Sequence, residues 1–230
     1  MRPCPPRTLA ITDRRLLSPA TREPDLVFER WLGALAERRV EAVQLREKDW
    51  PDRRCFEHLR RAVAVRGRRG PGRVLVNGRV DLALAARADG AHLPAAEPAI
   101  DRLRRVAGGD GLLIGRSTHR LEEVERARDE GADYVTFGPV FETPSKAAFG
   151  PPPGLEELER AVAVGLPVLA LGGLTPERVA AVAAAGAHGV AAIRSFHDLT
   201  VLDELMVACS EAWPTPHESA GGGETEGAGR

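Results

Sequence analysis

The chain has 230 residues, of which 43% are hydrophobic and 28% charged, and its formal net charge is -1. A chain of this length fits one large α/β domain or two small ones, and the composition is normal for a soluble globular protein. The net charge gives no overall attraction for nucleic acid or an anionic membrane. No segment has the apolar length that crosses a bilayer, and the N-terminal residues lack the apolar core of a secretory signal. The cysteines, Cys4, Cys55 and Cys209, lie far apart without metal-site spacing, so we expect reduced thiols in a cytoplasmic protein that binds neither nucleic acid nor membrane.

Short runs rich in Val, Ile and Leu alternate along the chain with stretches in which charged residues recur at helical spacing. The predicted strands are Thr8–Asp13, Ala42–Lys48, Arg73–Gly78, Gly90–Pro94, Leu112–Ser117, Tyr134–Val140, Val168–Gly173 and Gly189–Ser195. The predicted helices are Asp25–Arg38, Pro51–Arg66, Arg79–Arg87, Pro98–Ala107, Leu121–Glu130, Gly154–Val164, Pro176–Ala185 and Leu199–Ala212. Eight such units favour a closed (β/α)8 barrel, a TIM barrel, over an open doubly wound sheet.

The residues after Trp213 differ in composition from the rest of the chain. They are rich in Pro, Gly, Ser and Glu and contain almost nothing that could be buried. We therefore expect one barrel domain over residues 1–213 and a disordered tail over residues 214–230.

The end of the second predicted strand carries two cations. Alternation along a strand puts Gln44, Arg46 and Lys48 on one side. Active sites of (β/α)8 barrels lie at the carboxyl ends of the strands, so these side chains suit an anionic substrate. A structural ion pair between Arg46 or Lys48 and a neighbouring acid is the alternative interpretation.

Glycines follow the seventh predicted strand. Loops after strands seven and eight of such barrels commonly bind phosphate through backbone N–H groups, and Gly172 and Gly173 would let an oxyanion approach closely. Arg194 and Ser195 end the eighth predicted strand. A turn that needs positive φ would have the same Gly-Gly sequence, so position in the repeat is the stronger signal for a phosphorylated small molecule.

A histidine follows the fifth predicted strand. His119 lies two residues after Ser117, where a near-neutral imidazole could accept a proton and return it elsewhere. A purely structural histidine is the alternative. His92 ends the fourth predicted strand beside Leu93 and Pro94 and makes a weaker case. Beyond the sixth strand, Thr143, Ser145 and Lys146 form a candidate anion-binding loop.

Seven motifs together resemble the thiamine phosphate synthase/TenI superfamily over nearly the whole chain apart from the tail. They are QLREK, VNGRVDLAL, ADGAHL, IGRSTH, GADYVTFGPVFETPSK, LALGGLTPERV and AGAHGVAAI. The resemblance implies a (β/α)8 barrel acting on a thiazole phosphate in thiamine biosynthesis, in barrels that often form homo-oligomers. It implies acid/base catalysis by His119 and phosphate binding by Gly172, Gly173, Arg194 and Ser195. Further substrate contacts are implied for Gln44, Arg46, Lys48, Asn77, Thr143, Ser145 and Lys146.

The superfamily has two main activities, and the chain departs from one of them. The synthase, a transferase that couples a pyrimidine pyrophosphate with the thiazole phosphate, usually carries carboxylates for Mg²⁺ after its third and fourth strands. Here Gly78 replaces the first carboxylate, and Glu97 alone remains at the second position. Mg²⁺ is usually held by one or two carboxylates plus substrate phosphates, so this loss should weaken metal-assisted chemistry.

The other activity is that of the thiazole tautomerase, an isomerase whose third strand resembles Val76 to Asp81. The expected function is therefore a metal-independent proton shift on a carboxylated thiazole phosphate, with no cofactor. Two alternatives remain. One is the synthase, with Mg²⁺ held by Glu97 and the phosphates, and the other is a non-catalytic regulator that binds pathway metabolites.

Overall fold

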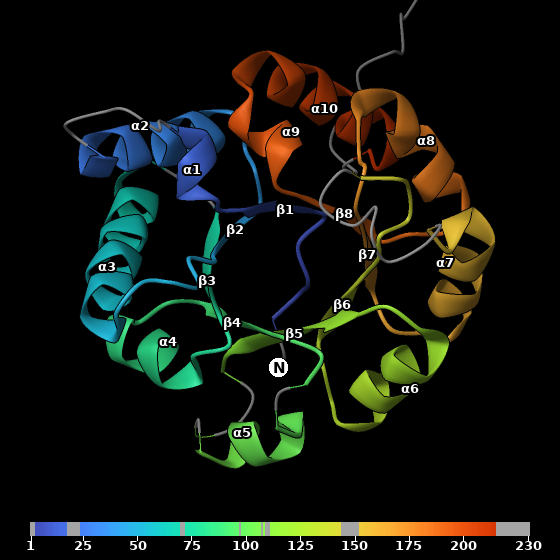
Figure 1. Ribbon diagram of the computed structural model, residues 1–230, viewed down its shortest axis with the longest axis horizontal. Coiled ribbons are helices and arrows are strands. Elements are labelled where there is room, and N and C mark those ends of the chain that lie inside the picture. Colours follow the sequence, from blue (N-terminus) through green and yellow to red (C-terminus); the bar gives the residue numbers. More distant parts are fainter. Residues whose placement is uncertain are drawn as a thin grey trace, which may run out of the picture.

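The computed structural model describes residues 3–17, 24–69, 72–96, 98–106, 108, 111–143 and 152–214. Its eight parallel strands close into a barrel in the order β1-β2-β3-β4-β5-β6-β7-β8, which confirms the predicted (β/α)8 fold. Figure 1 looks along the barrel and shows the helices as a ring around the strands. The strands are β1 (Thr8–Ile11), β2 (Ala42–Leu45), β3 (Arg73–Asn77), β4 (Gly90–Leu93), β5 (Leu113–Thr118), β6 (Tyr134–Phe137), β7 (Val168–Leu171) and β8 (Gly189–Ala192).

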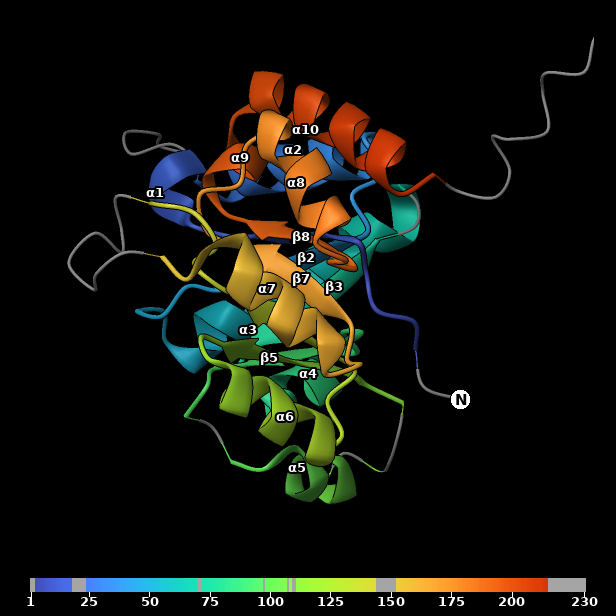
Figure 2. The same cartoon turned by 90° about the vertical axis from the view of Figure 1, so that its right-hand side faces the viewer.

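The helices follow the predicted alternation, with two short additions. They are α1 (Arg14–Leu17), α2 (Pro24–Glu37), α3 (Asp52–Arg69), α4 (Val80–Ala86), α5 (Ile100–Val106), α6 (Leu121–Asp129), α7 (Gly154–Ala163), α8 (Pro176–Ala184), α9 (Arg194–His197) and α10 (Leu199–Ala212). The unpredicted α1 and α9 directly follow the first and last strands. Figure 2 shows α8, α9 and α10 on one side of the barrel. No helix in the described ranges has both the length and the apolar composition of a membrane span.

Several strands end earlier than the sequence predicts. β2 ends at Leu45 instead of Lys48, β7 at Leu171 instead of Gly173, and β8 at Ala192 instead of Ser195. The chain leaves the ladder at these points because the loops turn, as at Gly172, where φ is 97°. The prediction that Arg194 and Ser195 lie in a strand is therefore wrong, since both belong to α9.

The core has two parts, as expected for a barrel whose strands are covered on both faces. Inward side chains of alternate strand residues fill the barrel, and the members of this inner cluster are Leu9, Ile11, Ala42, Leu75, Leu113, Tyr134, Leu169 and Ala191. Outward side chains pack against the helices in a second, larger cluster that includes Phe28, Leu59 and Leu158. The barrel centre is thus filled, so a substrate can bind only at its ends.

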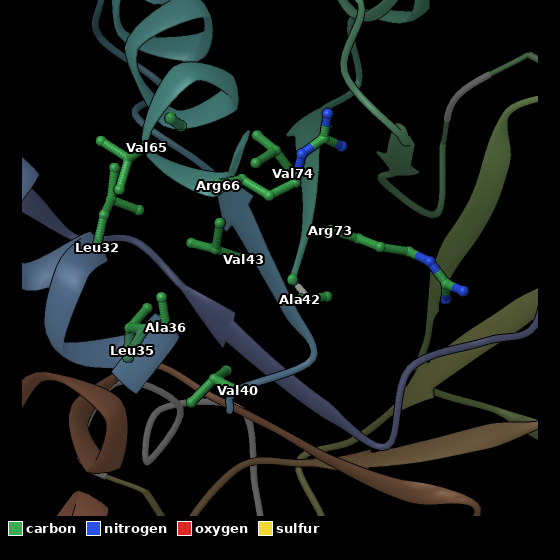
Figure 3. Close-up of a pocket in the computed structure, with 12 residues that line it drawn as sticks. Leu32, Leu35, Ala36, Val40, Ala42, Val43, Val65, Arg66, Arg73 and Val74 are labelled. Carbon is green, nitrogen blue, oxygen red and sulfur yellow. The ribbon is translucent and has the colours of Figure 1, made fainter. Parts of the chain in front are cut away.

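A small hollow lies between α2, α3 and the first residues of β2 and β3 (Figure 3). Apolar side chains line most of it, among them Leu32, Leu35, Val43 and Val65. Its volume is about 30 Å³, whereas substrate pockets are roughly ten times larger or more. The hollow is a packing gap near the amino ends of the strands, away from the end where barrel enzymes bind ligands.

Two aspartates of the repeated turns before strands bind the neighbouring strand. Oδ2 of Asp133 accepts from the backbone N of Ile114 at 2.6 Å and from Nη2 of Arg104 at 2.8 Å. Asp89 accepts in the same way from the backbone N of Val74 at 2.7 Å and pairs with Arg66. Each carboxylate thereby joins an outer helix to the start of a strand.

Replacing Asp133 by Ala should destabilise the protein strongly. The side chains of Arg104 and Asp133 are 9% and 2% exposed, so the substitution leaves a buried guanidinium without its carboxylate. Removal of one partner from a buried pair costs about 3–5 kcal/mol. Urea unfolding of Asp133→Ala should show a loss of this order.

The matched control is Asp203→Ala, which removes the 60% exposed partner of Arg38. An exposed pair contributes about 1 kcal/mol or less. Equal losses of unfolding free energy in the two variants would contradict the role assigned to Asp133.

Candidate active site at the carboxyl ends of the strands

Loops that follow β5, β6 and β7 are joined into one rim by backbone hydrogen bonds. The N–H of Gly138 donates to the carbonyl oxygen of Thr118 at 3.2 Å. The N–H of Val140 donates to Leu171 at 2.8 Å, and that of Phe141 donates to Gly172 at 3.2 Å. The rim residues from three strands therefore hold one another in place.

Gly172 and Gly173 occupy conformations that other residues adopt poorly, with φ of 97° and 64°. A Cβ on Gly172 would lie 2.6 Å from Cα of Pro139, and one on Gly173 would lie 2.6 Å from the carbonyl oxygen of Glu142. Both glycines are thus required by the packing of the rim itself.

The short helix α9 follows β8, in the region where (β/α)8 barrels commonly build a phosphate site. Ser195 is buried, and its hydroxyl donates to the carbonyl oxygen of Leu174 at 2.6 Å. That bond ties α9 to the loop after β7, so backbone N–H groups at the start of α9 are the groups that can face a phosphate. Arg194 is exposed beside them.

The two cations after β2 have no carboxylate partner in the described part of the chain. The acids next to them are paired elsewhere, because Arg14 binds Glu47 at 3.2 Å and Asp49 at 2.5 Å. Arg46 is half-buried and Lys48 exposed. The alternative of a structural ion pair for these two residues is therefore not seen among the described residues, and their positive charge is left for an anion.

Two amides form a polar layer below these cations. Nε2 of Gln44 donates to Oδ1 of Asn77 at 3.1 Å. Gln44 is 1% exposed, and its Oε1 is buried without a hydrogen-bond partner among the described residues. A buried carbonyl oxygen left unsatisfied is costly, so this oxygen suits an N–H donor of a bound heterocycle.

His92 is the centre of a buried network that the sequence analysis did not identify. Its Nδ1 lies 3.0 Å from the hydroxyl of Tyr134, and its Nε2 lies 3.0 Å from Oγ of Ser117 and 3.3 Å from Oγ1 of Thr136. The available signal was the alternation of strand residues, which directs all four side chains into the barrel. The chain neighbours of His92, Leu93 and Pro94, do not reveal the network, because its partners lie on β5 and β6.

Burial keeps His92 neutral. Loss of water, with smaller contributions from the charges of Arg46 and Arg116, lowers the pKa of His92 to about 3. A neutral imidazole has one N–H and one acceptor nitrogen, and its two ring nitrogens therefore play different roles.

His119 lies on the rim just after β5 and is exposed. Its Nδ1 lies 2.5 Å from the carbonyl oxygen of Gly138, which can only accept a hydrogen bond. Nδ1 therefore carries the proton, and Nε2 of the neutral ring is the acceptor. The backbone N–H of His119 donates to Glu123 at 2.6 Å, which further fixes the residue.

The remaining candidates lie at the edge of the described residues or outside them. Thr143 is the last described residue of the loop after β6, and Ser145 and Lys146 lie outside the described residues. Glu97 also lies outside them.

The described residues do not form the carboxylate site that the resemblance implies for Mg²⁺. Gly78 follows Asn77 with φ of 71° and contributes no oxygen ligand from a side chain. Within the described ranges, no three His, Cys, Asp or Glu side chains are grouped so that they could hold a metal ion.

The strands form a closed parallel barrel, with two cations after β2, a glycine loop after β7 and a short helix after β8. These features define the class of (β/α)8 barrels that bind phosphorylated small molecules. A family model described as "Thiamine monophosphate synthase" matches residues 10–196. The chain therefore belongs to the thiamine monophosphate synthase family.

Relatives and a solved structure agree with this assignment. The thiamine-phosphate synthase of Anaeromyxobacter dehalogenans is 47% identical over 155 residues, which are 67% of this chain and 68% of that protein. The thiamine-phosphate synthase of Methanoculleus marisnigri is 45% identical over 157 residues, 67% of this chain and 72% of that protein. The structure of thiamine phosphate pyrophosphorylase from Pyrococcus furiosus matches with a TM-score of 0.77 at 29% identity, covering 90% of this chain and 96% of that chain.

These comparisons contradict the expected thiazole tautomerase. The relatives are named as synthases, which are transferases and not isomerases. The expectation depended on the missing carboxylate at Gly78. Its loss removes an oxygen ligand but leaves intact the cations after β2 and the backbone groups after β7, so it does not exclude binding of two phosphorylated substrates.

The pH dependence of stability should report the buried state of His92. Unfolded histidine has a pKa near 6.5 and folded His92 one of about 3, so between these values only the unfolded chain takes up this proton. The resulting contribution to stability is complete above pH 6.5 and is lost as the pH falls, by about 1.4 kcal/mol per pH unit. Urea unfolding from pH 6.5 to 4.5 should therefore show a smaller loss of stability in His92→Gln than in the wild type.

The control is Thr8→Val, which removes a hydroxyl near the amino end of β1 that accepts from the backbone N–H of Glu41 at 2.9 Å. Because neither threonine nor valine titrates, this variant should keep the wild-type slope with pH. An unchanged slope in His92→Gln would show that His92 is protonated in the folded protein.

Proposed function

We propose that this protein is a transferase of the thiamine-phosphate synthase type, which joins a pyrimidine pyrophosphate to a thiazole phosphate and releases pyrophosphate. The observation that carries the proposal is the pair of separate anion-binding regions on the rim. One consists of Arg46 and Lys48 after β2, and the other of Gly172, Gly173 and the start of α9. In the closed barrel, β8 and β1 lie between β7 and β2, so the two anions would bind as neighbours.

The geometry supports a defined role for each group. Backbone N–H groups after β7 and at α9 hold the phosphate of the thiazole, and the cations after β2 hold the pyrophosphate. Gln44 and Asn77 orient the pyrimidine through their amides, with the unpaired Oε1 of Gln44 accepting from the ring system. Binding both substrates in one orientation replaces an encounter of two molecules in water with a reaction between fixed neighbours.

In the coupling step, the bond between the pyrimidine methylene carbon and the pyrophosphate oxygen breaks, and the oxygen keeps the electron pair. The thiazole nitrogen then bonds to that carbon through its lone pair. Arg46 and Lys48 stabilise the negative charge that grows on the leaving oxygen. The attacking nitrogen loses no proton, so this step does not use His119 as a general base, and His119 is proposed to contact the substrate from the rim.

The direct test is an assay with a synthetic pyrimidine pyrophosphate and thiazole phosphate, run with Mg²⁺ and again with EDTA. We expect thiamine phosphate and pyrophosphate to form in equal amounts. The ratio of the rates with Mg²⁺ and with EDTA measures how much a metal ion adds to the catalysis provided by the protein side chains. Absence of product under both conditions, with the protein folded by circular dichroism, would contradict the proposed reaction.

Removing one cation should slow the reaction. Arg46→Met keeps most of the length of the side chain but removes its charge, and the loss of a group that stabilises developing charge typically lowers the rate about 100-fold. Steady-state kinetics with varied pyrimidine pyrophosphate would measure kcat and KM.

Arg53→Met is the matched control, because Arg53 is a 91% exposed arginine of α3 that pairs with Glu57. It should retain the wild-type kcat/KM. A loss no greater in Arg46→Met than in this control would remove Arg46 from the proposed mechanism.

A further inference from the structure

Gly115 on β5 has no side chain, and this lets a residue of β4 contact a residue of β6 inside the barrel, across β5. Gly115 is in register with His92 on β4 and with Tyr134 on β6. A Cβ on Gly115 would lie 2.2 Å from Cζ of Tyr134 and 2.6 Å from its hydroxyl oxygen. The tyrosine ring thus fills the space above Gly115 and reaches across β5 to His92, which lies 3.0 Å from its hydroxyl.

Among the described residues, the hydroxyl of Tyr134 has one hydrogen-bond acceptor within reach, a ring nitrogen of His92. Tyr134 is fully buried in the apolar inner cluster with Leu9, Leu75 and Leu113. Burial raises the pKa of Tyr134, so the hydroxyl keeps its proton. Among the described residues its hydrogen-bond partner is Nδ1 of His92, and a buried O–H without an acceptor would be costly. Nδ1 of His92 therefore accepts, and Nε2 carries the single proton of the ring.

This tautomer determines how Ser117 is used. The N–H at Nε2 points to Oγ of Ser117 at 3.0 Å and is shared with Oγ1 of Thr136 at 3.3 Å. Oγ of Ser117 is then the acceptor of that bond, so its own hydrogen is available to another group. Ser117 is a half-buried residue near the carboxyl end of β5, and the loop that carries Arg46 follows β2 at the same end of the barrel. In the opposite tautomer, the serine hydrogen would turn inward to His92.

We propose that Tyr134 and His92 form a positioning pair that holds the Ser117 hydroxyl as a hydrogen-bond donor toward a pyrophosphate group bound beside Arg46. The pair does not touch the ligand. It acts by fixing one tautomer of an imidazole that lies between the barrel interior and the rim. This inference deepens the proposed function, on which its choice of anion rests.

The first test is binding of inorganic pyrophosphate, measured by isothermal titration calorimetry, to the wild type and to three variants. Tyr134→Phe removes only the hydroxyl, and Ser117→Ala removes the proposed donor. Each should weaken binding about 10- to 100-fold, the loss expected for one hydrogen bond to a charged group. The double variant should bind no more weakly than Ser117→Ala, because the tyrosine acts only through the serine.

The second test reads the tautomer directly. The ¹⁵N spectrum of the His92 ring should show the proton on Nε2 in the wild type and a share of it on Nδ1 in Tyr134→Phe. Thr8→Val is the control, since Thr8 is a buried residue near the amino end of β1 whose hydroxyl accepts from the backbone N–H of Glu41. It should change neither the His92 spectrum nor the affinity for pyrophosphate.

Three results would overturn the proposal: a proton on Nδ1 in the wild type, unchanged affinity in Tyr134→Phe, or losses that add in the double variant. Neither measurement needs turnover, so the positioning pair can fail while coupling is observed, and it can hold when coupling is absent. If coupling is observed, Tyr134→Phe and Ser117→Ala should lower kcat/KM for the pyrimidine pyrophosphate by similar factors.

Discussion

The interior of a closed eight-stranded barrel must be filled by side chains from alternate residues of every strand, and the rest of this structure depends on that constraint. Leu9, Leu75, Leu113 and Leu169 fill most of the space. At one point the constraint is met by a glycine beside a tyrosine, and this exchange brings a hydroxyl to His92. The apolar side chains inside the barrel are therefore followed, toward the carboxyl ends of the strands, by a layer of polar side chains next to the candidate ligand-binding rim.

On the rim after β2, the acidic side chains are paired with an arginine, whereas the two cations have no carboxylate partner among the described residues. Arg14 comes from the unpredicted α1 and neutralises both Glu47 and Asp49, the acids beside Arg46 and Lys48. Without Arg14, those carboxylates would compete with an anionic ligand for the two cations. The short helices after β1 and β8 thus contribute to the candidate site as well as to the barrel. Arg14 of α1 pairs with the acids, and Ser195 ties α9 to the loop after β7.

The fold was predictable because the sequence repeats one pattern eight times, an apolar run typical of a buried strand followed by charged residues at helical spacing. The positions of Arg46, Gly172 and Gly173 at strand ends were predictable for the same reason. Contacts across strands were not. The link from His92 to Ser117 and Tyr134 depends on strand register and on the space left by Gly115, neither of which appears in the local sequence. The end of β8 was also misplaced, because Arg194 and Ser195 turn into α9 after an apolar run that resembles a longer strand.

The choice between isomerase and transferase shows how an absent residue can mislead. Gly78 in place of a carboxylate argued against pyrophosphate chemistry, since a metal ion would have fewer ligands. Stabilisation of a leaving pyrophosphate depends on the total positive charge and hydrogen bonding that it meets, and a metal ion is one source among several. Arg46, Lys48 and a serine hydroxyl directed by a buried imidazole are others. A tautomerase acting on a carboxylated thiazole phosphate would also use two anion-binding regions, one for its phosphate and one for its carboxylate. Two cations after β2 match the higher charge of a pyrophosphate, and the relatives named as synthases agree with that match. The charge that is present is therefore stronger evidence for the reaction than the one carboxylate that is missing.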